Sequence, residues 1–106
     1  MITQENVLQE LILHYNELQD KFAVKSLAIF GSVARNEINE NSDIDLLVEF
    51  NSPVGLFEFL TLQDYLQTLF NRKVDLVTKS ALKPQLRDKI LQEAIYAYNF
   101  RRNANL

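Results

Sequence analysis

The sequence predicts an α/β (α+β) domain in which a small mixed three-stranded sheet is flanked by about four helices. Apolar residues recur at helical spacing in three long segments, and short apolar or β-branched runs lie between them. The chain has 106 residues, of which 47% are hydrophobic and 24% charged, and these values are usual for one globular domain. Because no repeat or linker divides the sequence, we expect residues 1–106 to form a single domain.

The first half of the chain predicts two helical segments and two strands. Apolar residues three and four apart predict a helix over 3–22. The apolar run 26–30 predicts a buried strand that ends at Gly31. The polar segment 32–42 suits one helical turn followed by a loop, and 43–50 reads as a central strand with one end in solvent.

The second half predicts two more helices and a third strand. A turn cluster at 51–55 precedes helical spacing over 56–70. The β-branched and apolar run 72–78 predicts a strand, although it contains one acid. Helical spacing over 82–100 predicts a last helix, with Pro84 suited to its first turn.

Charge and cysteine content exclude several classes of function. The formal net charge is −3, so long nucleic acids are not expected as partners. The absence of cysteine excludes disulfides and thiolate metal sites, and it fits a reducing compartment such as the cytoplasm. Neither a signal peptide nor a membrane span is expected. Only two glycines are present, and each is expected where the backbone has little choice.

Three aspartates occupy strand positions that are usually apolar: Asp43, Asp45 and Asp75. Alternation along a strand places Asp43 and Asp45 on one face, with α-carbons about 6.6 Å apart. Solvated residues at a strand entrance, or a β-bulge, are the simpler explanation of an isolated pair of this kind. The apolar neighbours of Asp75 predict burial, so this acid needs a metal ion or a cation such as Arg72 or Lys73.

Convergence of the three acids would predict bound metal, since the carboxylates repel one another without it. Oxygen ligands favour Mg²⁺, with Mn²⁺ as the alternative. The only histidine, His14, lies on the first predicted helix and is expected to be a surface or boundary residue.

Gly31-Ser32 lies where a strand ends and a helical turn begins. Backbone N–H groups and a serine hydroxyl at such a turn can bind phosphate oxygens. A plain turn at the end of the strand is the simpler interpretation of the dipeptide alone.

Together these motifs resemble a known signature. Gly31-Ser32, ten residues and then Asp43-Ile44-Asp45, in the setting IFGSVARNEINENSDIDLLVEF, resemble the DNA polymerase beta-like nucleotidyltransferase superfamily. The run RKVDLVT resembles the strand that brings the third carboxylate of this superfamily. The similarity covers about residues 26–78. It is strongest to the minimal nucleotidyltransferases, which are often encoded beside a HEPN-type partner and act as antitoxins.

The resemblance assigns a role to each motif residue. It implies that Gly31 and Ser32 bind the β- and γ-phosphates of a nucleotide. Asp43 and Asp45 would hold two Mg²⁺ ions, and Asp75 would complete the site and help deprotonate the acceptor hydroxyl. For the motifs to meet, strands 26–30 and 43–50 must be antiparallel, and strand 72–78 must be parallel to 43–50.

Two further residues belong to this segment. Arg35 would reach the triphosphate by resemblance, and it is equally well explained as a surface arginine paired with Glu37 or Glu40. Ser42, just before the first acid, is most simply a turn or cap residue.

The implied reaction is the attack of an acceptor hydroxyl on the α-phosphorus of a nucleoside triphosphate. Since 106 residues leave no room for an acceptor domain, the acceptor is expected on another macromolecule. The function expected from the resemblance is transfer of AMP from ATP to a hydroxyl, that of a tyrosine, on a partner HEPN toxin, with which the chain could form an oligomer.

Two alternatives remain open. The chain could neutralise its partner by binding alone, with Tyr96, Tyr98 and Phe100, followed by Arg101-Arg102, as a contact surface. Core positions of a last helix with a frayed tail explain the same residues. Modification of a small molecule of the aminoglycoside type would need a second subunit.

Overall fold

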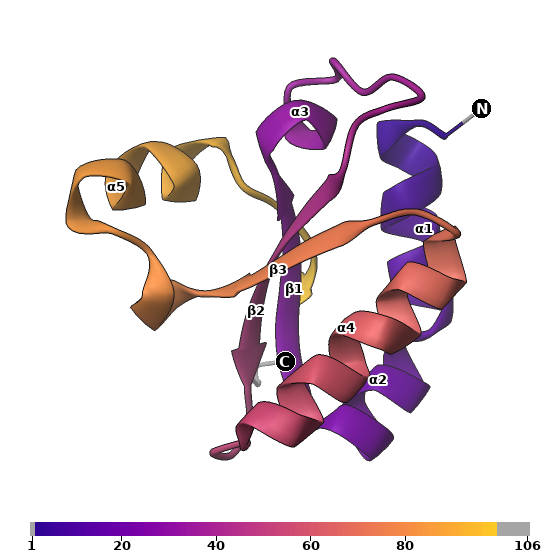
Figure 1. Cartoon of the computed structure of the whole chain (residues 1–106), viewed down its shortest axis with the longest axis vertical. Coiled ribbons are helices and arrows are strands. Elements are labelled where there is room, and N and C mark those ends of the chain that lie inside the picture. The colour runs from indigo at the N-terminus through magenta and orange to yellow at the C-terminus, as the bar shows by residue number, and fades with distance from the viewer. Residues whose placement is uncertain (1, 100–106) are drawn as a thin grey trace, which may run out of the picture.

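The computed structural model describes residues 2–99. Four short runs rich in β-branched and aromatic residues form one mixed sheet. The strand order is β3-β2-β1-β4 (Figure 1). The strands are β1 (Val24–Phe30), β2 (Ile44–Phe50), β3 (Val74–Thr78) and β4 (Ile95–Asn99). β1 pairs antiparallel with β2 and β4, whereas β2 and β3 are parallel. The predicted directions of the first three strands are therefore confirmed.

One face of the sheet is covered by α1 (Gln4–Leu13), α2 (Tyr15–Phe22) and α4 (Leu56–Phe70) (Figure 1). The main core lies between these helices and the sheet, and its larger members are fully buried. They include Val7, Leu11, Leu18, Leu27, Ile29, Ile44, Leu46, Val48, Leu62 and Leu66. The predicted helix 56–70 has the bounds of α4, which links the parallel strands as a crossover.

The other face is covered by the short 3₁₀ helix η1 (Lys79–Ala81) and by α5 (Pro84–Glu93), which lies across the sheet from the other long helices (Figure 1). A smaller apolar cluster forms here, from Ala28, Phe30, Leu47 and Leu82, with Ile90, Leu91 and Ala94 packed against it. β1 and β2 are thus buried on both faces, which explains their nearly continuous apolar sequences.

The predicted single helix over 3–22 is interrupted at His14, which separates α1 from α2. His14 ends α1, and its Nδ1 lies 2.9 Å from the carbonyl oxygen of Glu10. A carbonyl can only accept, so Nδ1 carries the proton in this contact. His14 is half-buried, as expected for a boundary residue.

The predicted last helix is wrong beyond Glu93, and the sheet has four strands instead of three. The backbone becomes extended at Ala94, with ψ of 136°, and β4 then pairs with β1. The reason is that β1 would otherwise leave its backbone groups unpaired along one edge. A β-branched and aromatic run is well suited to fill that edge.

The C-terminal tyrosines accordingly lie on a strand. Tyr98 packs against the main core and makes an edge contact with Tyr15, with ring centroids 4.6 Å apart. Tyr96 is exposed on the opposite face, beside Lys79. Phe100, Arg101 and Arg102 lie outside the described residues. Among residues 2–99, no helix has both the length and the apolar content needed to cross a bilayer.

Candidate active site

The end of β1 and the start of β2 bring the two halves of the motif into contact. Phe30, the last residue of β1, pairs with Asp45, so Gly31 follows directly beside that carboxylate. Gly31 has φ of +68°, and a Cβ atom there would overlap Asp45 Oδ2. Both the backbone conformation and the close approach require glycine at this position.

Asp75 lies next to Asp45 on the neighbouring parallel strand, because the register pairs these two residues. Asp75 is exposed, so its predicted burial is wrong. β3 is an outer strand whose face toward α4 is buried at Val74 and Leu76, whereas on its other face Val77 packs against the smaller apolar cluster and Asp75 is left uncovered. The second face of β3 is therefore open to solvent at the start of the strand, where Asp75 lies.

Asp43 stands just before β2 and not inside it, since the strand begins at Ile44. Its exposed carboxylate lies 3.9 Å from Lys73 Nζ. Arg72 donates from Nη1 to the carbonyl oxygens of Asn39 and Ser42, at 2.7 and 3.0 Å. In residues 2–99, neither Arg72 nor Lys73 forms an ion pair with Asp75. Both instead hold the segment before β2 against the start of β3.

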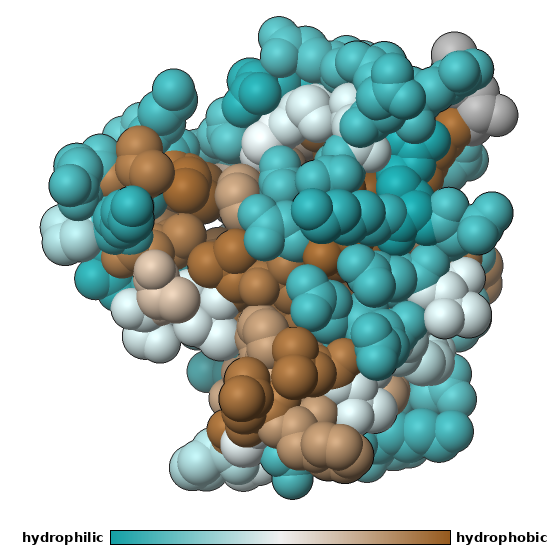
Figure 2. All heavy atoms as spheres, in the orientation of Figure 1, coloured by the Kyte–Doolittle hydropathy of each residue, from teal (hydrophilic) through white to brown (hydrophobic). Residues whose placement is uncertain are grey.

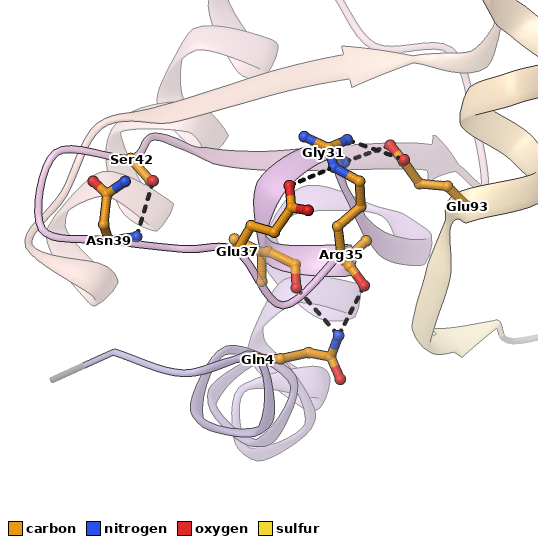
Figure 3. A network of polar contacts seen from close by, with 9 residues as sticks. Gln4, Gly31, Arg35, Glu37, Asn39, Ser42 and Glu93 are labelled. Carbon is orange, nitrogen blue, oxygen red and sulfur yellow. Dashed lines mark hydrogen bonds and ion pairs between the residues drawn. The ribbon is translucent and has the colours of Figure 1, made fainter.

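The turn before Asp43 is closed by Ser42. The Asn39 N–H donates to Ser42 Oγ, and the Ser42 N–H donates to the Asn39 carbonyl (Figure 3). This confirms Ser42 as a turn residue.

The three acids influence one another electrostatically. Burial, together with the negative charges of Asp75 and Asp43, raises the pKa of Asp45 from 3.8 to about 6. Arg35 acts in the opposite direction but is outweighed. Asp45 is thus a half-buried carboxylate beside two other acids, an arrangement that an added cation would stabilise.

The donor set suits a hard cation such as Mg²⁺. The chain has no cysteine, and its single histidine is engaged at the junction of α1 and α2, so only oxygen donors are available here. Within residues 2–99, no three acidic, histidine or cysteine side chains are already gathered to hold a metal ion. The inference that a cation binds here therefore depends on the negative charges of the acids and on their oxygen donors.

The segment that begins at Gly31 forms the short helix α3 (Gly31–Ala34). Gln4 anchors it by donating from Nε2 to the carbonyl oxygens of Val33 and Ala34 (Figure 3). In the described part of the chain, the half-buried Ser32 has no hydrogen-bond partner for its hydroxyl, which remains available as a donor.

Arg35 follows α3 and forms two ion pairs. Its Nε lies 2.9 Å from Glu37 Oε1, one of the pairings expected for a surface arginine. Its Nη1 lies 3.1 Å from Oε1 of Glu93, a residue that the sequence did not single out. The pairing with Glu40 is not found among the described residues.

Glu93 also accepts a 2.8 Å hydrogen bond from the Gly31 N–H through Oε2 (Figure 3). Burial opposes its ionisation, but the bonds from Gly31 and Arg35 outweigh burial and lower the pKa of Glu93. Glu93 was missed because it was expected inside a longer helix, and no local pattern relates it to Gly31, 62 residues earlier.

The site lies on an open end of the sheet. A groove of about 740 Å³ occupies the opposite end, where it is lined by the last residues of β2, the turn 51–55 and η1, and it contains none of the predicted site residues. Exposed apolar side chains, including Leu56, Phe57 and Leu60, gather near that groove at the start of α4. Figure 2 shows this apolar patch and the mostly hydrophilic surface around α3.

Comparisons with known proteins agree with this architecture. Residues 11–97 match the family described as "Nucleotidyltransferase domain". The chain is 40% identical over 96 residues to the protein adenylyltransferase MntA of Thermococcus cleftensis, covering 91% of this chain and 97% of that protein. A solved structure described provisionally as a minimal nucleotidyltransferase has a TM-score of 0.74 and 35% identity, covering 89% of this chain and 95% of the other.

A second solved structure shares the fold at 18% identity and a TM-score of 0.66, covering 92% of this chain and 73% of the other. It contains a tri-AMPylated Shewanella oneidensis HEPN toxin in complex with an MNT antitoxin. The match over residues 11–97 and the 40% identity to a relative of nearly equal length lead to one conclusion: the chain belongs to the nucleotidyltransferase domain family and is a nucleotidyltransferase.

Proposed function

We propose that this chain is a Mg²⁺-dependent protein adenylyltransferase that transfers AMP from ATP to a tyrosine hydroxyl of a partner HEPN toxin in the cytoplasm, and so acts as an antitoxin. The observation that carries the proposal is the contact of Gly31 with Asp45, with Asp75 in register beside it. The names of the relatives support adenylyl transfer to a protein acceptor over a small-molecule acceptor.

The phosphates would be bound by the segment that follows β1. The Gly31 N–H, the Ser32 hydroxyl and the Arg35 guanidinium all lie on α3 or directly after it. These groups supply a backbone donor, a hydroxyl donor and a positive charge, which together suit the β- and γ-phosphates.

Two Mg²⁺ ions would be held by the carboxylates of Asp43, Asp45 and Asp75. When bound, such ions neutralise the triphosphate and favour the ionised form of the attacking hydroxyl. The pKa of Asp45, raised by burial and by the negative charges of Asp75 and Asp43, supports this assignment, because a bound cation would offset both effects.

In the transfer step, the acceptor oxygen forms a bond to the α-phosphorus while the bond from that phosphorus to the oxygen of the β-phosphate breaks. Pyrophosphate leaves, and the proton of the hydroxyl passes to the carboxylate of Asp75. Asp75 is exposed on the outer strand, so a side chain presented by another protein can approach it.

The test is incubation of the chain with its candidate HEPN partner, Mg²⁺ and ATP labelled at the α-phosphate. We expect label on the partner, and loss of label with Asp43→Asn combined with Asp45→Asn. Asp88→Asn removes one exposed charge of α5 that forms no ion pair among the described residues and is not part of the motif, so this variant should transfer AMP normally. Label that persists in the double variant would contradict the mechanism. A partner silenced equally well by the double variant would instead favour neutralisation by binding alone.

A further inference from the structure

The carboxylate of Glu93 is bound by two of the groups that the proposed function assigns to the nucleotide. Its Oε2 accepts from the Gly31 N–H at 2.8 Å, and its Oε1 lies 3.1 Å from Arg35 Nη1 (Figure 3). The side chain is only 18% exposed, although α5, which it ends, has no fully buried residue. The contact joins α5 to residues 62 and 58 positions earlier in the chain.

The geometry makes Glu93 and a phosphate competitors. A backbone N–H has a single hydrogen, which makes a strong, well-aligned bond to one acceptor at a time. Carboxylate and phosphate oxygens are both anionic acceptors that form charge-assisted bonds with such donors and with arginine. A triphosphate that takes the Gly31 N–H must therefore displace Glu93 from it.

We propose that Glu93 is an internal ligand of the phosphate-binding groups, which it occupies in the nucleotide-free protein and leaves when a nucleoside triphosphate binds. The proposal rests on the proposed function, since it concerns the same phosphate site. The Glu93 contact keeps Gly31 and Arg35 paired before the nucleotide arrives. It also lowers the apparent affinity for the nucleotide, which equals the affinity of the open form multiplied by the fraction of molecules in which the contact is open.

The two-glycine composition provides a direct probe of this contact. Protein labelled with ¹⁵N-glycine gives amide signals from Gly31 and Gly55 alone. In Glu93→Gln without nucleotide, the Gly31 signal should move and the Gly55 signal should stay. In the wild-type protein, a non-hydrolysable ATP analogue with Mg²⁺ should also move the Gly31 signal, because its hydrogen-bond acceptor changes.

Affinity provides the second measurement. We expect Glu93→Gln to bind the ATP analogue about three- to tenfold more tightly than wild type, which corresponds to a closed contact in most nucleotide-free molecules. Glu93→Asp keeps the charge on a side chain one methylene shorter, too short to maintain both contacts, and should also bind more tightly. Asp88→Asn removes the same charge from an exposed position of α5 and should leave the affinity unchanged.

Equal or weaker binding by both Glu93 variants would overturn the proposal and make Glu93 a permanent support for Arg35. A Gly31 signal unmoved by the ATP analogue, in a protein that still transfers AMP to its partner, would overturn it while the proposed function stands. Absence of nucleotide binding and transfer in all variants would overturn both.

Discussion

Asp45 should destabilise the metal-free protein, so Asp45→Asn is predicted to stabilise it while abolishing transfer. Burial and the adjacent acids raise the pKa of Asp45 from 3.8 to about 6. A rise of this size corresponds to about 3 kcal/mol of unfavourable free energy at neutral pH. Because Asp45 is only half-buried, solvent screening reduces this to about 1 kcal/mol. For a domain of this length, we expect a melting temperature about 4–8 °C higher in the variant.

The predicted effect depends on pH in a defined direction. Between pH 3.8 and about 6, the folded protein retains a proton on Asp45 that the unfolded chain has released. The wild type therefore loses stability as pH rises through this window, and the full cost is present above it. The difference in melting temperature between wild type and Asp45→Asn should be largest at pH 7.5 and should approach zero near pH 4.

Thermal melts in EDTA from pH 4 to pH 8 measure this difference, with Asp88→Asn as the control for removal of one exposed charge. Adding Mg²⁺ should raise the melting temperature of the wild type more than that of Asp45→Asn, because only the folded wild type presents the complete acidic site. A variant that melts at or below the wild-type temperature at pH 7.5 in EDTA would refute the reasoning. A difference that does not change with pH would refute it as well.

Three other substitutions test the geometry of the site. Gly31→Ala should cost about 1–2 kcal/mol, since φ is positive there and the added methyl overlaps Asp45; normal stability in a melt would contradict the described approach. Asp75→Asn should change the free energy of unfolding by no more than about 0.5 kcal/mol, because this side chain is exposed. It should lower the initial rate of AMP transfer at least about 100-fold, and an unchanged rate would show that Asp75 does not accept the proton. Arg72→Gln should lose both bonds to the loop 39–42 and speed its amide hydrogen exchange, at a cost of about 1 kcal/mol; unchanged exchange would show that these bonds do not hold the loop.

The first three strands and α4 could be predicted because their patterns are local. Apolar runs that end at glycine or at turn residues mark β1 and β2, and helical spacing over 56–70 gives α4 with its bounds. The resemblance carried by Gly31-Ser32 and the two acids anticipated that these motifs meet, and Gly31 and Asp45 do lie in contact. The strands and α4 needed only neighbouring residues and their periodicity, whereas the meeting of the motifs needed the resemblance as well.

The errors concern features that distant residues determine. The run 95–98 fits a helix by spacing and a strand by composition, and the unpaired edge of β1 decides between them. The exposure of Asp75 depends on which face of β3 is covered, and its apolar neighbours do not report this. The contact of Glu93 with Gly31 exists only because the last helix ends where it does.

The position of β3 at the edge of the sheet also affects the tendency of the chain to self-associate. An outer strand presents unpaired backbone groups that can add a strand from another molecule, and a charge on such a strand discourages this. Without Asp75, the five residues of β3 would be uncharged and mostly apolar, a composition prone to aggregation. Variants designed to inactivate the site should therefore keep a polar residue at position 75, because an apolar residue would promote self-association, and the resulting loss of activity could not be told from loss of the carboxylate.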